Sequence, residues 1–126
     1  DLYNDFENYI NHRNNTSTTR KEDLTHRFYT LMMDNYREHK EVIFYADKLH
    51  VSSKYLSEVV KETSGKSPKD WIIDYSLLEI KELLKNSSLN IQEITIRTKF
   101  LNQSALGRFF KRHTNMSPSE YRESTY

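Results

Sequence analysis

Two short runs of polar side chains carry the groups of this chain that are best suited to hydrogen bonding with another molecule. The first run comprises Ser53, Lys54, Ser57, Glu58 and Lys61, and the second comprises Gln103, Ser104, Gly107, Arg108, Lys111 and Arg112. A guanidinium such as that of Arg108 can donate two parallel hydrogen bonds to O6 and N7 of guanine, and the amide of Gln103 can pair with adenine. The ammonium groups of Lys61 and Lys111 suit phosphate oxygens. These groups together indicate recognition of double-stranded DNA.

Two residues of these runs admit more than one interpretation. Glu58 is unfavourable beside phosphates; its carboxylate either accepts a hydrogen bond from N4 of cytosine or weakens binding by the first run. Gly107 costs about 1 kcal/mol relative to alanine inside a helix. Either the backbone approaches DNA closely at Gly107, or the helix tolerates a poor helix former there. The sequence leaves both alternatives open.

The two runs belong to a pattern that occurs twice in the chain. Asn102 and Leu106 repeat Ser52 and Leu56 at an offset of 50 residues, and the Ser-Pro pair at 67–68 recurs at 117–118. Upstream of the runs the offset is 49, so the turn before the second run has one extra residue. A repeated unit that presents a polar helix after a short turn indicates two helix-turn-helix units, each with a recognition helix for one DNA groove.

Hydrophobic periodicity predicts an all-α fold with two helix-turn-helix subdomains joined by a long central helix. The chain has only 2 glycines and 2 prolines, too few for the turns of a β sandwich. Helices are expected over roughly 19–36, 42–49, 52–64, 68–85, 90–98 and 102–114, with a short final helix after 117. N-caps are expected at Thr19, Ser52, Ser67, Asn90, Asn102 and Ser117.

The sequence divides into a short N-terminal segment and one domain. Residues 1–18 are predicted to be the trailing helix and linker of a missing upstream domain, because an apolar stripe over 2–10 precedes a wholly polar stretch at 14–18. Residues 19–126 are predicted to form the DNA-binding domain, with the first helix-turn-helix at about 41–65, the linker helix at about 68–85 and the second helix-turn-helix at about 90–114. The first residue is Asp1 rather than methionine, which indicates a piece of a longer protein.

Charge is distributed unevenly along the chain. The net charge is only +1, but residues 94–119 contain Arg97, Lys99, Arg108, Lys111 and Arg112 and no acidic residue. A local basic face is enough to attract phosphate, since exposed charges farther than about 10 Å away are largely screened. A solvated helix face is the alternative interpretation of such a charge run. The duplicated recognition helix favours DNA.

Other classes of function find no support in the residues. The absence of cysteine excludes disulfides and thiolate metal sites. The five histidines are scattered, and no metal-ligand pair, phosphate-binding glycine loop or nucleophile elbow is present. No apolar run approaches the ~18 residues of a membrane span. We therefore expect no catalytic activity, no cofactor, no metal and no membrane association.

The two motifs also resemble a known family. Residues 45–67, from Tyr45 to Ser67, look like the first helix-turn-helix of AraC/XylS-type transcriptional regulators. Residues 102–122, which include Phe109–Arg112 and Met116–Pro118, are similar to that family's C-terminal signature. The family commonly has alanine at the position of Thr95 and glycine at the positions of Lys99 and Asn115.

The resemblance implies a sequence-specific DNA-binding module of a cytoplasmic transcription regulator, and leaves activation and repression as alternatives. It implies that two recognition helices enter adjacent major grooves on one face of the duplex. It also implies an upstream ligand-sensing or dimerising domain and RNA polymerase as a partner. A helical protein-interaction module without DNA binding is the alternative, and salt-dependent binding to duplex DNA distinguishes the two.

Overall fold

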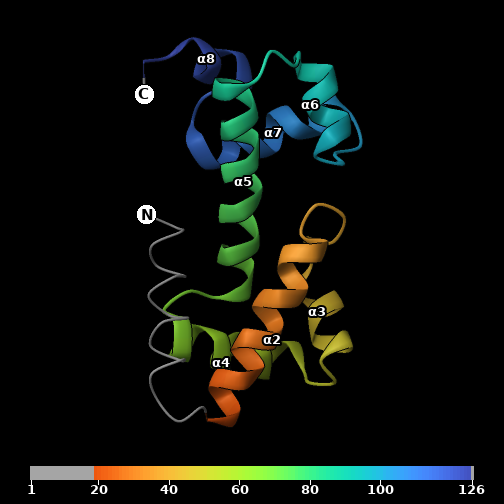
Figure 1. Ribbon diagram of the computed structural model, residues 1–126, viewed down its shortest axis with the longest axis vertical. Coiled ribbons are helices and arrows are strands. Elements are labelled where there is room, and N and C mark those ends of the chain that lie inside the picture. The colour runs from red at the N-terminus through yellow and green to blue at the C-terminus, as the bar shows by residue number, and fades with distance from the viewer. Residues whose placement is uncertain (1–18, 126) are drawn as a thin grey trace. The chain divides into compact units, whose positions relative to one another are not determined.

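The computed structural model describes residues 19–125, which are helical with no strand. The elements are α2 (Arg20–Asn35), α3 (Val42–Lys48), α4 (Ser53–Ser64), α5 (Pro68–Asn86), α6 (Ile91–Arg97), α7 (Gln103–Thr114) and α8 (Pro118–Glu123), as Figure 1 shows. The predicted all-α fold with two helix-turn-helix subdomains and a long intervening helix is confirmed. The helix and linker predicted over 1–18 lie outside the described residues.

The chain forms two compact units that divide within α5, between Tyr75 and Ser76. In unit 1, α3 and α4 form the first helix-turn-helix, called here the first head. In unit 2, α6 and α7 form the second head. The central helix contributes its N-terminal residues to unit 1 and its C-terminal residues to unit 2.

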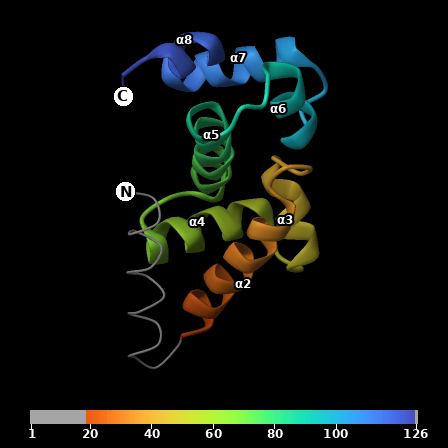
Figure 2. The ribbon, with the colours of Figure 1, turned by 45° about the horizontal axis from the view of Figure 1, so that its top comes forward.

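Unit 1 is built around α2, which packs against α4 and α3. Figures 1 and 2 show α2 crossing α4 in both views. Thr19 caps α2 by accepting from the Glu22 N–H at 3.0 Å, and Lys21 of α2 pairs with Glu62 of α4 at 3.1 Å. The buried side chains include Phe28, Met32, Tyr45, Leu56 and Trp71. Burial of these apolar surfaces is the main stabilising contribution in such a unit.

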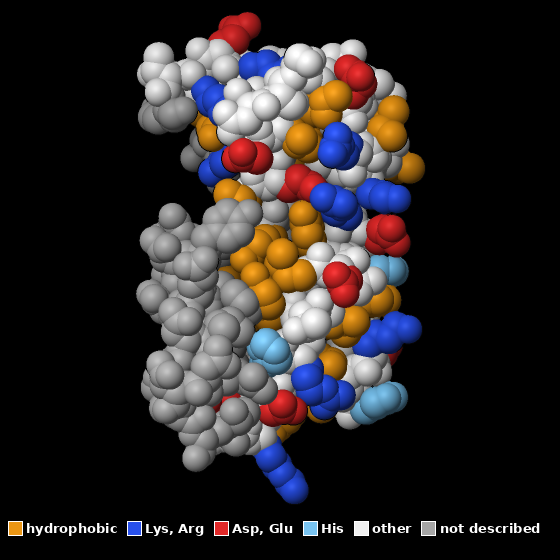
Figure 3. Space-filling model, viewed as in Figure 1, with side chains coloured by type: hydrophobic (Ala, Val, Ile, Leu, Met, Phe, Trp, Pro, Cys, Tyr) orange, Lys and Arg blue, Asp and Glu red, His pale blue; other side chains and the backbone are white. Residues whose placement is uncertain are grey.

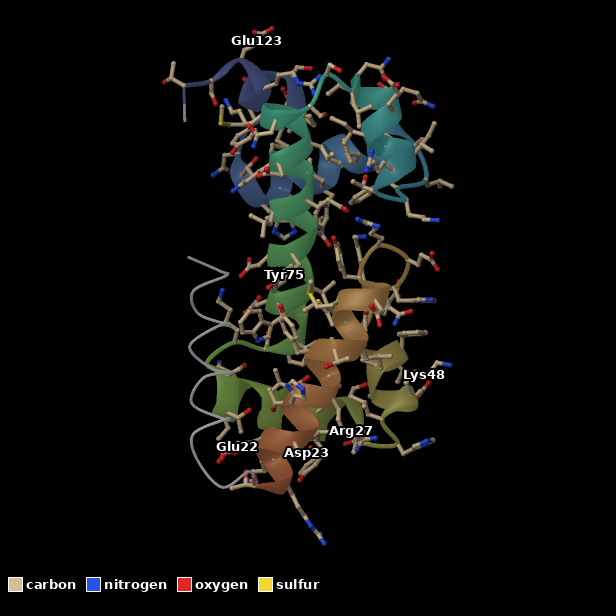
Figure 4. The ribbon with its side chains drawn as sticks, in the orientation of Figure 1. Glu22, Asp23, Arg27, Lys48, Tyr75 and Glu123 are labelled. Carbon is tan, nitrogen blue, oxygen red and sulfur yellow. The ribbon has the colours of Figure 1, made fainter. Side chains whose placement is uncertain are left out.

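Aromatic contacts hold the start of α5 against α2. The hydroxyl groups of Tyr29 and Tyr75 are hydrogen-bonded at 2.6 Å, and Figure 4 labels Tyr75 on α5. The Trp71 indole N–H donates to Ser64 Oγ at 2.9 Å.

Tyr45 of α3 is buried with its hydroxyl group hydrogen-bonded: it donates to the His39 carbonyl at 2.7 Å. Burial of the Tyr45 hydroxyl, with a smaller contribution from Glu41, raises its pKa far above the ordinary value, so it remains a donor.

Unit 2 is built around the C-terminal half of α5, with α6, α7 and α8. The fully buried side chains include Ile80, Leu84, Ile94, Leu106 and Phe110. Arg122 of α8 donates through Nε to the Leu84 carbonyl at 2.8 Å, and Lys85 donates to the Ser124 carbonyl at 2.5 Å. The Arg122 bond satisfies a carbonyl at the end of α5, and the two bonds together attach the last helix.

Two threonines in the core of the second head are satisfied within α6. Thr95 Oγ1 donates to the Ile91 carbonyl, and Thr98 Oγ1 donates to the Ile94 carbonyl, each at 2.7 Å. Burial of these hydroxyl groups therefore leaves no unpaired donor. None of the helices in the described part of the chain combines the length and the apolar character needed to cross a membrane.

Candidate nucleic-acid interface

The turns of the two heads close with the same hydrogen bonds. In the first head the Val51 N–H donates to the Ala46 carbonyl at 3.0 Å, and in the second the Phe100 N–H donates to the Thr95 carbonyl at 3.1 Å. Each turn contains one residue in the left-handed region, His50 at φ 59° and Lys99 at φ 64°. Lys99 thus adopts the conformation for which the resemblance implies glycine.

The recognition helices begin and end alike. Ser52 caps α4 by accepting from the Tyr55 N–H at 3.0 Å, and Asn102 caps α7 by accepting from the Ala105 N–H at 2.8 Å. Both N-caps were predicted from the repeat and are confirmed. Each helix ends in a left-handed residue, Gly65 at φ 87° and Asn115 at φ 63°. The repeated sequence therefore forms the same turn, the same N-cap and the same helix end twice. We call this shared set of features the backbone frame of a head.

The extra residue of the second turn is Leu101. The offset changes from 49 to 50 between Phe100 and Asn102, which leaves Leu101 without a counterpart in the first head. Its side chain is 91% exposed, directly before the N-cap of α7. Ile96 of α6 is also 66% exposed. The turn of the second head therefore presents apolar side chains to solvent.

The structure places the predicted residues of the first run on α4. Lys54, Glu58 and Lys61 are exposed, and Ser53 and Ser57 are half-buried. The opposite stripe of this helix, with Leu56, Val59 and Val60, is buried. Lys54, Glu58 and Lys61 thus lie on the outer face of α4, as the periodicity predicts, whereas the Ser53 hydroxyl oxygen is buried and has no hydrogen-bond partner among the described residues.

The predicted residues of the second run lie on α7. Gln103, Ser104, Arg108, Lys111 and Arg112 are exposed, and Gly107 is half-exposed. Leu106 and Phe110 are buried beneath them. Each head therefore brings its own set together on the outer face of one helix, and the two sets belong to different units.

Gly107 has open space on its outer side. A Cβ built at this position meets no atom within 4 Å, and the residue does not occupy the left-handed region. Neither internal packing nor backbone conformation therefore requires glycine here. This observation leaves contact with another molecule, or simple tolerance, as the reason for it.

The cations on these faces are available to a ligand. Within the part of the chain that the structure describes, Lys54, Lys61, Arg108 and Arg112 form no ion pair. Figure 3 shows lysine and arginine side chains standing out from the surface of each unit. Uncompensated cations on a recognition helix favour a polyanion as the ligand.

Other polar features of the described residues do not form a site of a different kind. Residues 19–125 contain no cluster of histidine and acidic side chains placed to hold a metal ion. A shallow hollow in unit 1 lies between α2 and α3, lined by residues that include Arg27 and Lys48, both labelled in Figure 4. Its lining mixes cations with Asp34 and apolar side chains, which selects no particular ligand.

Sequence reasoning missed three features of the heads. The left-handed conformations of His50 and Lys99 were not predicted, although histidine is enriched in this region and the resemblance implies glycine at the position of Lys99. The exposure of Leu101 follows from its position as the extra residue of the turn. Gln92 of α6 accepts a hydrogen bond from Gln103 at 2.8 Å, and it belongs to neither polar run.

Comparisons with known proteins agree with this geometry. A family model described as a helix-turn-helix domain matches residues 45–124. An uncharacterised helix-turn-helix transcriptional regulator of Bacillus subtilis, YobQ, is 32% identical over 77 residues, which is 61% of this chain and 32% of that protein. Another uncharacterised helix-turn-helix transcriptional regulator, YdiP of Escherichia coli, is 28% identical over 93% of this chain and 39% of its own length. The chain thus spans about a third of the curated relatives it matches.

Solved structures show the same architecture. The C-terminal domain of AraT, a response regulator from Geobacillus stearothermophilus, matches with a TM-score of 0.71 and 25% identity, over 86% of this chain and 93% of that one. The DNA-binding domain of AdpA, solved in complex with a target DNA, shares the fold with a TM-score of 0.65 and 23% identity, over 78% of this chain and 88% of that one. The chain therefore belongs to the helix-turn-helix family, as a DNA-binding domain of the AraC type found in transcriptional regulators.

Proposed function

We propose that this domain reads a specific DNA sequence by inserting α4 and α7 into adjacent major grooves of one duplex. The observation that carries the proposal is the outer face of α7, where exposed Arg108 and Arg112 have no ion-pair partner among the described residues. No acidic residue occurs over 94–119, so the segment that contains this helix adds no negative charge of its own against phosphates. The shared backbone frame of the two heads supports the same role for α4.

The side chains divide into groups that position the protein and groups that read bases. Lys54, Lys61, Lys111 and Arg112 fix the register on phosphates, together with the backbone N–H groups at the helix starts. Arg108 forks onto guanine, and Gln103 pairs with adenine. Glu58 accepts from cytosine N4, and the short side chains of Ser53, Ser57 and Ser104 permit close approach to base edges. Gly107 lies where α7 comes nearest to the duplex.

The domain functions as part of a longer regulator. The chain spans about a third of its curated relatives, and residues 1–18 fit the trailing helix and linker of an upstream sensing or dimerising domain. Relatives include the lactose operon transcription activator of Staphylococcus xylosus and the activator RhaS of Escherichia coli. By analogy, this protein activates transcription in the cytoplasm through contact with RNA polymerase. The family to which it belongs is not enzymatic.

Selection of bound sites from random duplex DNA, followed by titration over a range of salt concentrations, tests the proposal. We expect one preferred sequence, bound much more tightly than unrelated duplexes, with an affinity that falls steeply as salt rises. Lys61→Ala should weaken binding to all sequences and reduce the salt slope by about 1. Equal affinity for every duplex would contradict sequence-specific reading, and affinity independent of salt would contradict phosphate contact.

A further inference from the structure

The second head contains a side-chain hydrogen bond with no counterpart in the first. Gln103 Nε2 on α7 donates to Gln92 Oε1 on α6 at 2.8 Å. The corresponding residues of the first head are Ser53 and Ile43, whose side chains cannot form such a bond. Ser53 Oγ has no hydrogen-bond partner among the described residues, and Ile43 is 57% exposed. The two heads, alike in backbone, therefore differ in how the first residue of the recognition helix is held.

Both ends of this bond lie in helical turns that are themselves fixed. Gln92 follows the N-cap of α6, where Asn90 and Glu93 form a reciprocal capping box with bonds of 2.8 and 3.0 Å. Gln103 directly follows Asn102, the N-cap of α7. Because the two backbones are anchored, the bond between the amides restricts the Gln103 side chain rather than moving a helix.

The bond leaves the reading groups of Gln103 available. An amide nitrogen carries two N–H groups, so donation to Gln92 leaves one N–H and the carbonyl oxygen. One amide N–H and the carbonyl oxygen are the groups with which a glutamine pairs with N7 and N6 of adenine. Gly107 lies one helical turn beyond Gln103, on the same side of α7, and a Cβ there would meet no atom within 4 Å. Space for a base edge therefore lies beside the restrained amide.

We propose that Gln92 is a positioning residue that orders the Gln103 amide for recognition of adenine, an inference that rests on the proposed function. A free glutamine side chain loses rotamer freedom when it binds, and this loss weakens binding. A side chain already ordered by Gln92 loses less. Gln92 therefore sharpens discrimination at one base pair without contacting DNA.

A double-mutant cycle tests the proposal on the preferred duplex obtained by selection. The base pair read by Gln103 is the one at which Gln103→Ala abolishes preference. Affinities are then measured for this duplex and for variants with each other base at that position, with the wild type, Gln92→Ala, Gln103→Ala and the double variant. We expect Gln92→Ala to reduce discrimination about two- to twelvefold, the factor that a typical net hydrogen bond provides. In the Gln103→Ala background the same change should have no effect.

Two further variants separate positioning from other effects. Gln92→Glu keeps an acceptor for the Gln103 amide and should retain the base discrimination that Gln92→Ala loses. Ile43→Ala alters the equivalent exposed position of α3 and should leave discrimination at the Gln103 base pair unchanged. Loss of affinity from Gln92→Ala that persists without Gln103, or unchanged discrimination in Gln92→Ala, would overturn the proposal. Failure of the wild type to prefer any duplex would instead overturn the proposed function.

Discussion

Among the exposed side chains of α4 and α7, that of Arg108 has the most specific match to a base edge, because a guanidinium can donate two hydrogen bonds to guanine. It is exposed on α7 and has no ion-pair partner among the described residues, so its guanidinium is free to fork onto guanine. We expect Arg108→Ala to cost about 1–3 kcal/mol on the preferred duplex and to relax selectivity at one position. Arg108→Lys should retain the charge and still lose that selectivity, because an ammonium cannot form the bidentate pair. Titration against single-base variants of the duplex measures both effects.

The matched control for Arg108 is Arg112, one turn later on the same helix. Arg112→Ala removes the same charge from a residue assigned to phosphate. It should weaken binding to all duplexes by a similar factor and leave base preference intact. If Arg108→Ala also weakened every duplex equally, Arg108 would belong with the phosphate contacts instead.

A substitution at Gly107 distinguishes the two interpretations of this glycine, which are close approach of the backbone to DNA and tolerance of a poor helix former. Because a Cβ at this position meets no atom of the protein, Gly107→Ala should stabilise α7 by about 1 kcal/mol, the difference in helix propensity. Urea unfolding followed by circular dichroism measures this gain. If the backbone of α7 approaches DNA at Gly107, as we propose, the same variant should bind the preferred duplex more weakly because of the added methyl group. Wild-type affinity in a stabilised variant would mean that glycine is merely tolerated there.

At the scale of the elements, the backbone conformation of the turn in the second head slightly lowers the free energy of unfolding. Lys99 lies at φ 64°, where an L-residue is disfavoured by roughly 1–2 kcal/mol. Lys99→Gly should therefore raise the free energy of unfolding by up to about 1 kcal/mol, since glycine adopts this conformation freely but loses more entropy on folding. Lys99→Ala removes the same side chain without relieving the backbone and should give no gain. Equal stability of the two variants in urea would show that the turn carries no such cost.

The capping box of α8 makes a prediction about pH. Hydrogen bonds from the Ser117 N–H and hydroxyl, with a contribution from nearby Lys111, hold the pKa of Glu120 below its ordinary value. A carboxyl group whose pKa is lowered on folding stabilises the protein above its unfolded-state pKa, and this contribution is lost as pH falls through the lowered value. Glu120→Gln should therefore flatten the acid side of the stability profile. Glu123→Gln removes the same charge from α8 outside the capping box and is the matched control for the loss of charge.

The elements also show which features follow from sequence alone. N-caps such as Ser52, Asn102 and Ser117 were predictable because capping is a local interaction between a side chain and the backbone three residues on. The outer faces of α4 and α7 were predictable because helical periodicity separates buried from exposed positions. The left-handed conformation was not predicted at His50 or Lys99: lysine does not favour it, and the enrichment of histidine in this region does not single out one position. The Gln92–Gln103 hydrogen bond forms because the turn brings two exposed side chains of different helices together. Hydrophobic periodicity does not predict contacts between exposed side chains.

At the scale of the whole molecule, a small net charge of +1 coexists with a DNA-binding role because the charges are segregated. The acid-free stretch at 94–119 lies in the second head, whereas the recognition helix of the first head carries Glu58. We infer that the two heads contribute unequally, with more of the salt-dependent affinity coming from α7. The shared hydrogen bonds and helix ends give the two heads the same backbone frame, and we propose that their different outer residues determine which bases each helix recognises.

The duplicated head leads to a prediction about the DNA site. Each head presents one helix, and the same side of the major groove recurs after one turn of B-form DNA, about ten base pairs. We expect selected sites to contain two short elements about ten base pairs apart, so that both heads approach one face of the duplex. Insertion of about five base pairs would place the elements on opposite faces and should reduce affinity towards that of a single element. A footprint confined to one groove per molecule, or binding indifferent to this insertion, would contradict two-headed recognition.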